Sequence, residues 1–228
     1  MRYLVPVLAS LLFCAAAQAQ SVPAPAPLTN PGTIALTLDA CGGSFDWNLA
    51  EFLVAQHIPA TIFATRLWID RNPQAVTFLR AHADLFVVEN HGARHRSPVL
   101  GVSRGPYGVP AVSTLTGLQE EVNGGADAVE RAVGRHPRWF RGATALYSPA
   151  ALMELKAAGW GVAGYTVALD DGASLPAAKV AERTLRAHAG DVLLGHINKP
   201  DSGTGPGLAQ ALPVLLARGV RFGHLTGP

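Results

Sequence analysis

Two histidines stand four positions apart in the segment "NHGARH", His91 and His95. If this segment forms one helical turn, both imidazole rings point to the same side and can bind one divalent cation. Zinc is the cation that imidazole most often binds, and a catalytic zinc site keeps one position open for water. A solvated basic loop is the alternative, because two histidines at this spacing without an adjacent glutamate form a weak motif. The pair directly follows a hydrophobic run, residues 85–90, and this placement favours the metal site.

Polar side chains also stand in or at the ends of other hydrophobic runs. They are Asp39, Asn90, Arg141, Asp170, Asp171 and His196. The ends of parallel strands lie along one edge of a sheet, and the loops there carry the chemistry. Asp39 could take a proton, bind a metal or cap the glycine turn that follows it. His196 could be a buried structural histidine or a general acid poised by Asp170. We therefore predict a catalytic site at this edge.

The hydrophobic pattern from Thr33 onward alternates short strand-like runs with amphipathic segments, which predicts parallel strands joined by helical crossovers. The expected strands are residues 33–39, 59–65, 85–90, 138–144, 160–169, 191–197 and 221–226. Pro73 and Pro149 stand where a first helical turn tolerates proline, and glycines 159, 190 and 219 are expected to end three helices. About seven strands and six helices predict an α/β fold, a shortened and irregular (β/α)7 barrel. A doubly wound open sheet is the alternative.

The first nineteen residues have the pattern of an export signal. Arg2 precedes an apolar run, residues 3–17, and Ala17-Gln18-Ala19 is a small-x-small cleavage pattern. The run is shorter than the roughly 20 apolar residues that span a bilayer, so we expect no stable membrane insertion. A lipoprotein signal at Cys14 is disfavoured by the bulky Phe13 before it. The expected protein is exported, either periplasmic or secreted.

The remaining chain divides into residues 20–31, a Pro/Ala-rich segment expected to be an extended tether, and one folded domain, residues 32–228. The formal net charge is +2, and no basic stripe suggests binding to nucleic acid. A hydrophobic content of 49% is enough for one core. Cys41 is the single cysteine beyond the signal, so no internal disulfide can form. With no histidine near it in sequence, Cys41 is expected to be a small buried residue and not a nucleophile.

Five segments in order resemble the motifs of the polysaccharide deacetylases, the NodB-homology group also called carbohydrate esterase family four. The segments are "LTLDACGG", "NHGARH", "FRGATALY", "ALDDGAS" and "LLGHIN". They are similar to the family's T-F-D-D-G, H-[ST]-x-x-H, R-P-P-Y, fourth-motif and L-x-H patterns. The resemblance extends from about Gly32 to Leu225, nearly the whole chain beyond the signal. It implies a barrel of the NodB-homology type.

The resemblance also implies a metal-dependent hydrolase that removes N-acetyl or O-acetyl groups from a polysaccharide or peptidoglycan-type substrate. In such a mechanism Zn²⁺ or a similar cation polarises the acetyl carbonyl and activates water. By position, His91 and His95 would hold the metal and Asp39 would be the base. Arg141 would orient Asp39.

The closing step of the implied mechanism is protonation of the departing amine. By position, His196 would be this general acid. Asp170 would tune His196, and it is preferred to Asp171 because it follows the expected strand directly.

Two departures from the family pattern leave part of the site open. Ala40 stands where most members have a second aspartate that binds the metal, and Gly142-Ala143 replaces the double proline. Asp46 is the nearest spare carboxylate and is predicted as the third metal ligand; the alternative is that Asp39 itself binds the metal. Because of Ala40, a catalytically silent carbohydrate-binding protein is an alternative function. An amidase acting on another non-peptide C–N bond is a further one.

Few aromatic side chains are candidates for stacking on a sugar ring. Tyr107 and Tyr147 fall in expected loops, whereas the four tryptophans are assigned to helices and strands. The other histidines are expected to be structural. These are His57, His82, His136, His188 and His224.

Overall fold

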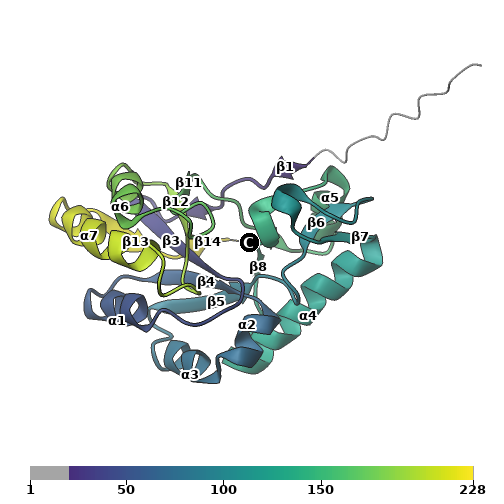
Figure 1. Cartoon of the computed structure of the whole chain (residues 1–228), viewed down its shortest axis with the longest axis horizontal. Coiled ribbons are helices and arrows are strands. Elements are labelled where there is room, and N and C mark those ends of the chain that lie inside the picture. Colours follow the sequence, from purple (N-terminus) through teal and green to yellow (C-terminus); the bar gives the residue numbers. More distant parts are fainter. Residues whose placement is uncertain (1–20, 228) are drawn as a thin grey trace, which may run out of the picture.

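The computed structural model describes residues 21–227 of the chain. The predicted signal peptide, residues 1–19, lies outside the described residues. Among the helices that are described, none has the length and apolar character needed to cross a membrane. Figure 1 shows the strands in the middle of the molecule with helices around them.

The strands are β1 (Val22–Pro23), β2 (Leu28–Thr29), β3 (Thr33–Ala40), β4 (Ala60–Ala64), β5 (Phe86–Asn90), β6 (Ser97–Leu100), β7 (Ala111–Ser113), β8 (Trp139–Phe140), β9 (Leu146–Tyr147), β10 (Gly161–Val162), β11 (Val167–Ala168), β12 (Val192–His196), β13 (Arg221–Gly223) and β14 (Leu225–Thr226). The helices are α1 (Trp47–Ala55), α2 (Arg66–Arg71), α3 (Pro73–Ala81), α4 (Leu115–Val133), α5 (Pro149–Ala157), α6 (Ala177–Leu185) and α7 (Thr204–Ala217), with 3₁₀ turns η1 (Pro106–Gly108) and η2 (Ala143–Ala145).

The main sheet is parallel, and seven of its strands lie in the order β10-β8-β5-β4-β3-β12-β11. An eighth strand, β13, pairs with the beginning of β3. The sheet curls into a part-barrel, so the predicted irregular (β/α)7 barrel is confirmed and the doubly wound open sheet is wrong. Strands β3 and β4 are buried almost throughout, which explains their nearly continuous hydrophobic sequences.

The strand expected at residues 160–169 is two strands in the structure. Its first part, β10, pairs with β8, and its second part, β11, pairs with β12 at the opposite edge of the sheet. The residues between them cross the gap between the two edges. Ala163 and Gly164 lie in this crossing and offer their backbone carbonyls to Arg141. Residues 163–166 therefore connect the two edges of the sheet without forming a strand of it.

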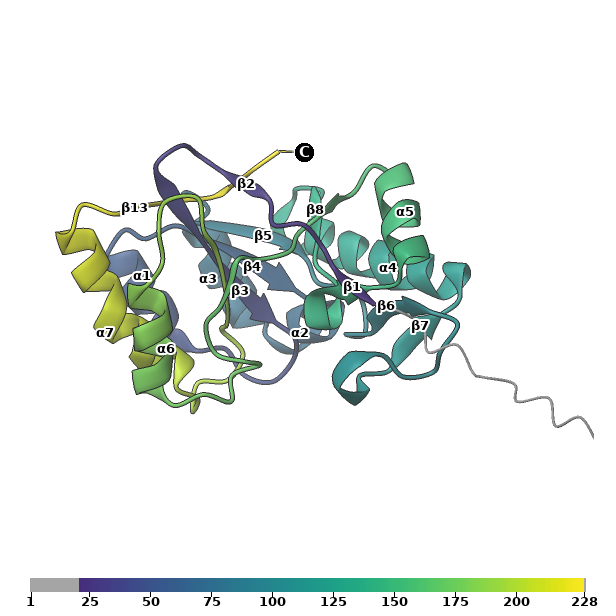
Figure 2. The same ribbon diagram turned by 90° about the horizontal axis from the view of Figure 1, so that it is seen from above.

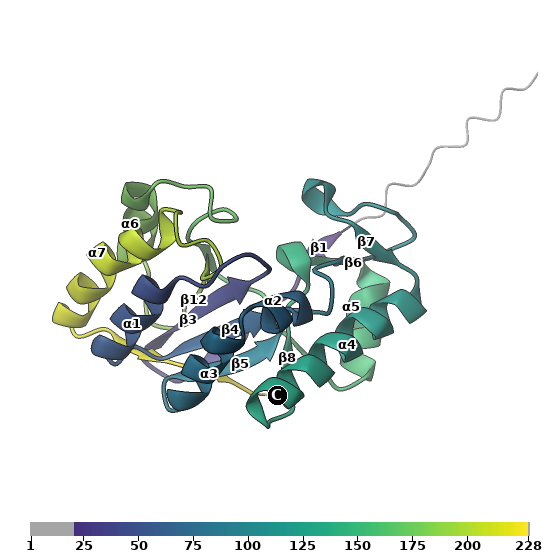
Figure 3. The ribbon, with the colours of Figure 1, turned by 60° about the horizontal axis from the view of Figure 1, so that its bottom comes forward.

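The helices cover the outer side of the sheet, and Figure 3 shows α1, α3, α2 and α4 in front of β3, β4 and β5. Several helices begin at a side-chain cap: Asp46, Thr65, Thr114 and Ser148 each accept a backbone N–H of the first turn. Their apolar faces and the sheet enclose the main core. Its largest members include Trp68, Ile34, Leu36, Leu38, Leu49, Leu53, Ile58 and Ile62.

The segment expected to be a tether is packed against the domain. Strand β1 pairs with β9 and β2 pairs with β14, and Ala24 between them is buried. We call residues 21–29 the N-terminal strap, and Figure 2 shows it crossing the molecule from β2 to β1. Pro25 accepts the N–H of Gly164 through its carbonyl, at 2.9 Å. Proline has no N–H to donate, but an edge strand uses only some of its N–H groups in pairing and therefore tolerates proline. The Pro-rich composition of this segment is thus compatible with packing against the domain.

Candidate active site

Strand β3 brings the first functional side chains to one edge of the sheet. Alternation along the chain places Thr37, Asp39 and Cys41 on the same side and Ala40 on the other. Asp39 lies opposite His196 of β12 in the strand pairing. The register of these two strands therefore brings together an acid and an imidazole that are distant in sequence.

Asp39 is buried and held by Arg141. Arg141 Nη1 donates to Asp39 Oδ1 at 2.9 Å and also to Thr37 Oγ1. Burial alone would raise the pKa of Asp39, but the positive charges of His91, Arg141 and His196 lower it below its ordinary value. The guanidinium lies 4.2 Å from the centre of the Phe63 ring, so Arg141 is fixed by both polar and aromatic contacts. Asp39 is therefore a charged carboxylate, and its second oxygen, Oδ2, is not engaged by Arg141 and faces His91.

His91 and His95 lie next to each other, with ring centres 5.0 Å apart. The Arg141 carbonyl lies 2.6 Å from His91 Nδ1 and accepts its proton, which leaves Nε2 as the free ring nitrogen. His91 Nε2 lies 3.6 Å from Asp39 Oδ2. Burial opposes protonation of His91, but Asp39 and Cys41 raise its pKa to about 8. The backbone at His95 has a positive φ of 57°, so no regular helical turn joins the two rings.

Cys41 is a candidate site residue that the sequence alone did not indicate. Its Sγ lies 3.4 Å from His91 Nε2, and it also contacts His95 and His196. Burial would raise the pKa of this thiol, but the surrounding imidazoles hold it well below its ordinary value. The signal in the sequence was strand alternation: position 41 shares the side of Asp39, whereas Ala40 faces the core. We expected only a small buried residue because its histidine neighbours are distant along the chain.

Cys41, His91 and His95 form a group that could hold a metal ion, since one ligand atom from each lies within 4.8 Å of the others. In a tetrahedral zinc site, bond lengths of about 2.0–2.3 Å place ligand atoms about 3.5 Å apart. Cys41 Sγ and His91 Nε2 already have this separation. A thiolate with two imidazoles is a donor set that suits zinc, whereas hard cations prefer oxygen. The residues present therefore fit a metal of this kind.

Asp46, the predicted third ligand, is not brought to the histidines. Its Oδ1 accepts the N–H of Leu49, 3.0 Å away, and so caps the first turn of α1. A Cβ at Gly205 of α7 would lie only 2.7 Å from the other carboxylate oxygen, which shows that Asp46 is packed between α1 and α7. Burial raises its pKa. The prediction was wrong because a helix N-terminus, which needs an acceptor, begins directly after Asp46.

His196 forms a pair with Asp170 on the other side of Cys41. His196 Nδ1 lies 2.9 Å from Asp170 Oδ1, and Thr204 donates its hydroxyl to Asp170 Oδ2 at 2.7 Å. Burial would lower the pKa of His196, but Asp170 and Cys41 raise it well above its ordinary value. Burial would likewise raise the pKa of Asp170, and hydrogen bonds from His196 and Thr204 lower it. Asp171 instead pairs with Arg183 at the surface.

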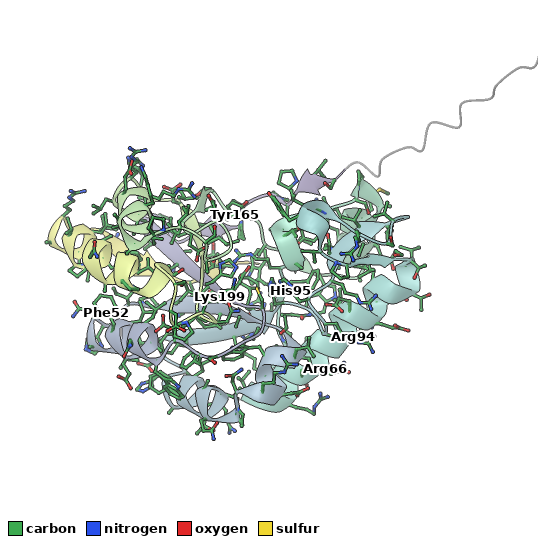
Figure 4. The ribbon with its side chains drawn as sticks, in the orientation of Figure 1. Phe52, Arg66, Arg94, His95, Tyr165 and Lys199 are labelled. Carbon is green, nitrogen blue, oxygen red and sulfur yellow. The ribbon has the colours of Figure 1, made fainter. Side chains whose placement is uncertain are left out.

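A cavity of about 660 Å³ opens above these groups; we call it the catalytic pocket. It is lined by Asp39, His95, Tyr107, Thr144, Tyr165, Ala168, Asp171, Gly172, Leu194 and His196. Figure 4 shows His95 near the middle of the molecule with Tyr165 above it. His95, Tyr107, Thr144 and Asp171 all have positive φ, four of the eight such non-glycine residues in the described part of the chain. Backbone strain of this kind gathers at functional sites because the surrounding structure must hold it.

The two predicted sugar-stacking tyrosines have different positions. Tyr107 lines the catalytic pocket and is 86% exposed, but Tyr147 is fully buried. The Gly142 N–H donates to the Tyr147 hydroxyl at 2.8 Å, so Tyr147 packs inside the protein. Tyr165 takes the second aromatic position in the pocket. None of the five histidines expected to be structural lines it.

A parallel barrel that carries an acid, three imidazoles and a thiol at the carboxyl edge of its strands defines a candidate hydrolase. The sequence model of the polysaccharide deacetylase family matches residues 27–163. The chain therefore belongs to the polysaccharide deacetylase family, hydrolases that act on carbon–nitrogen bonds other than peptide bonds. No curated protein matches the chain by sequence.

Solved structures with the same fold come from carbohydrate esterase family four. A peptidoglycan N-acetylglucosamine deacetylase has a TM-score of 0.72 at 19% identity, covering 86% of this chain and 87% of that one. A family 4 carbohydrate esterase from Streptomyces lividans, in complex with acetate, has a TM-score of 0.67 at 23% identity, covering 86% and 93%. A family pseudoenzyme from Bacillus anthracis has a TM-score of 0.68 at 20% identity, covering 89% and 68%. These likenesses support the fold.

Proposed function

We propose that the protein is an exported, metal-dependent hydrolase that removes acetyl groups from a polysaccharide or peptidoglycan-type substrate. The observation that carries this proposal is the catalytic pocket, whose lining includes a charged carboxylate, Asp39, and two imidazoles, His95 and His196. His95 belongs to the Cys41–His91–His95 group, and His196 is paired with Asp170 behind the pocket wall. N-acetyl groups are the preferred target, because a pocket with an ionised base and a protonated imidazole suits a poor amine leaving group. Export rests on the signal-like sequence of residues 1–19.

The proposed metal ligands are Cys41, His91 and His95, and zinc is the proposed cation. A zinc ion held there supplies a Lewis acid for the acetyl carbonyl and lowers the pKa of water. The Arg141 carbonyl fixes the tautomer of His91, so that Nε2 faces Cys41. The thiolate of Cys41 stands in for the carboxylate that Ala40 cannot provide.

Asp39 is the proposed general base. Arg141 occupies its Oδ1, which keeps the carboxylate ionised and directs Oδ2 toward His91 and the pocket. An ionised carboxylate in this position can take the proton of an attacking water. Arg141 is the positioning residue for Asp39, since it lies fully buried behind it.

His196 is the proposed general acid for the departing amine. Its Nδ1 is held by Asp170, and the pKa of His196, raised by Asp170 and Cys41, favours the protonated ring that a general acid needs. Asp170 is itself buried and held by Thr204, which prevents rotation of the pair. This is the arrangement expected for a residue that donates a proton late in a hydrolysis.

The upper walls of the catalytic pocket offer contacts for a sugar. Tyr107 and Tyr165 present aromatic rings, on which the apolar face of a sugar can pack. The Thr144 hydroxyl is buried at the pocket and has no hydrogen-bond partner among the described residues. An orphaned donor in a pocket is costly unless a ligand completes it, so Thr144 is proposed to bind a polar group of the substrate.

The direct test is acetate release from N-acetylated oligosaccharides by the purified protein, with and without a chelator. We expect release that stops on chelation and returns with added zinc. Release that persists without metal would overturn the proposed mechanism. It would favour instead attack of the Cys41 thiolate on the acetyl carbonyl, in which a thioester forms, the C–N bond breaks and the amine leaves with a proton from His196. Water would then hydrolyse the thioester and release acetate.

A catalytically silent carbohydrate-binding protein is the second candidate function. Two observations favour it: Ala40 replaces an acidic position of the family pattern, and a structural neighbour is described as a pseudoenzyme whose mutant has restored enzymatic activity. The discriminating measurement is metal content together with sugar binding. Sugar affinity without bound zinc in excess zinc would support the silent protein.

A further inference from the structure

A second cavity, of about 560 Å³, lies beside the loop of residues 91–96, which carries the proposed ligands His91 and His95. We call this cavity the basic pocket. Its charged lining residues are Arg66, Arg94, Arg96, Glu120 and Glu121. It shares no lining residue with the catalytic pocket. Figure 4 shows Arg94 and Arg66 near each other, on the opposite side of His95 from Tyr165. The two cavities therefore lie on different sides of the same loop.

The three guanidinium groups of the basic pocket are available to a ligand. Within residues 21–227, none of them takes part in a side-chain hydrogen bond or an ion pair. Elsewhere arginines are used structurally: Arg141 pairs with Asp39 and Arg183 with Asp171. Each free guanidinium offers five donors in a planar fork that matches a carboxylate or a phosphate.

Glu121 lines the same pocket, but its charge is already committed. The side chain is 3% exposed, and its oxygens accept the backbone N–H groups of Arg94 at 2.9 and 3.1 Å and of Arg96 at 3.0 Å. Gly92, with φ of 87°, passes so close that a Cβ there would meet the Glu121 carboxylate. The carboxylate thus fixes the backbone of the loop and leaves both arginine side chains to project outward. A ligand would meet positions that are already ordered, which reduces the cost of binding.

The basic pocket is also linked to the catalytic pocket through the chain. Arg94 and Arg96 are the two neighbours of His95, and consecutive Cα atoms are only about 3.8 Å apart. Residues that line the basic pocket therefore directly flank, in the chain, a residue that lines the catalytic pocket. We propose that the basic pocket binds an anionic group, a carboxylate or phosphate, on the glycan whose acetyl group enters the catalytic pocket. This proposal rests on the proposed function, and it makes an acidic acetylated glycan the preferred substrate class.

The test is calorimetric titration of metal-free protein, so that no glycan is turned over, with two N-acetylated oligosaccharides of equal length. One carries a carboxylate and the other is neutral; inorganic phosphate is titrated separately. We expect the acidic oligosaccharide to bind about tenfold more tightly or better, as charge-assisted hydrogen bonds predict. The double variant Arg94→Ala/Arg96→Ala should lose this preference and keep its affinity for the neutral oligosaccharide. Alanine retains the N–H groups that Glu121 accepts, so the loop should keep its fold.

Arg71→Ala/Arg80→Ala is the matched control, since it removes two exposed arginines that lie outside the basic pocket. An equal loss of preference in this control would overturn the proposal, because only net charge would then matter. Equal affinity of the natural protein for both oligosaccharides would overturn it too. Phosphate binding that depends on Arg94 and Arg96 without any preference for the acidic glycan would reveal a free-anion site and contradict the substrate assignment. Retained preference with no acetate release would support this site while overturning the proposed activity.

Discussion

At the scale of single residues, the distinguishing feature of the proposed metal site is the thiol of Cys41. The family pattern has a second aspartate at the preceding position, which is Ala40 in this chain. Cys41 contacts three imidazoles, and its pKa is held well below the ordinary value by them. A thiolate is a softer ligand than a carboxylate, so the choice of metal should shift toward zinc and cobalt and away from magnesium or manganese. The substitution of one donor atom therefore bears on the identity of the cofactor.

Replacing the Cys41 thiol should remove one of the proposed metal ligands. For Cys41→Ser we expect zinc affinity to fall by at least the roughly 10–100-fold that changes around a metal site produce. In the cobalt-loaded protein, the near-ultraviolet charge-transfer band of a cobalt–thiolate bond should disappear. Equilibrium dialysis and absorption spectra provide the two measurements.

Cys41→Asp is the matched variant for this experiment, because it supplies an oxygen ligand at the same position. It should retain more zinc than the serine variant but show no thiolate band. A band of full strength in either variant would contradict ligation by Cys41.

The His196–Asp170 pair makes a prediction about pH. Asp170 has a lowered pKa in the folded protein, so it stabilises the fold fully above about pH 3.9, the ordinary pKa of aspartate. This stabilisation is lost as the pH falls through the lowered pKa of the folded state. His196 has a raised pKa, so it stabilises the fold fully below about pH 6.5, the ordinary pKa of histidine. This stabilisation is lost as the pH rises through the raised pKa of the folded state. Asp170→Asn should therefore reduce the free energy of unfolding most between about pH 4 and 6.5, by about 1.5–3 kcal/mol.

Urea unfolding of the metal-free protein across the pH range measures this difference. Asp171→Asn serves as the control, because it removes only an exposed ion pair with Arg183 and should change the free energy of unfolding by less than about 1 kcal/mol. A cost for Asp170→Asn that stays constant from pH 3 to pH 9 would argue against the pair.

At the scale of elements, the segment that contains β6, η1 and β7 forms one wall of the catalytic pocket. Strands β6 and β7 pair with each other in a small separate sheet, and η1 between them carries Tyr107. Tyr107 has a φ of 55°, a conformation that costs about 1–2 kcal/mol for a residue with a side chain. A strained backbone that holds an exposed aromatic ring at the pocket supports the proposal that Tyr107 contacts the sugar.

Tyr107→Gly should separate strain from function. Glycine accepts a positive φ, so the free energy of unfolding should change little, since relief of strain offsets the added freedom of the unfolded chain. The KM for an acetylated oligosaccharide should rise by about 2- to 12-fold, as loss of a stacking contact of about 0.5–1.5 kcal/mol predicts. Steady-state kinetics and urea unfolding measure the two effects. Tyr107→Phe keeps the ring and should behave as the natural protein; an equal rise in KM for both variants would refute stacking.

At the scale of the whole molecule, the N-terminal strap, residues 21–29, packs against the segment that crosses between the two edges of the main sheet. The crossing residue Gly164 donates its N–H to the strap at Pro25 and accepts a hydrogen bond from Arg141 through its carbonyl. Arg141 in turn holds Asp39. The strap, the crossing and the proposed base are therefore connected through one glycine.

Gly164→Ala should disturb all three. A Cβ at this position would lie 2.1 Å from the Ala24 carbonyl oxygen, so the strap must move. We expect a loss of about 1–3 kcal/mol in the free energy of unfolding, the usual cost of overpacking, together with reduced acetate release. Gly42→Ala is the control, because a methyl group there meets nothing within 4 Å. Equal stability of the two variants would show that the strap is not tightly packed.

Much of the fold could be predicted because its signals are local. Hydrophobic runs located β3, β4, β5 and β12, and Ser148-Pro149 marked the start of α5, as the structure confirms. Such signals extend over a few residues, where side-chain periodicity and capping directly determine the backbone. The order of the five motifs likewise indicates the family.

The rest was decided by tertiary structure. Three features depend on which distant segments come together. Asp46 caps α1 instead of binding a metal, Cys41 contacts His91 fifty positions away, and the segment expected to be a tether, residues 20–31, is packed against the domain. Strand order and register determine those contacts, as in the pairing of Asp39 with His196. The sequence by itself determined the elements and the chemistry available at their ends. Only the curled packing of the sheet decided which side chains share one site, because that depends on interactions between segments that are distant along the chain.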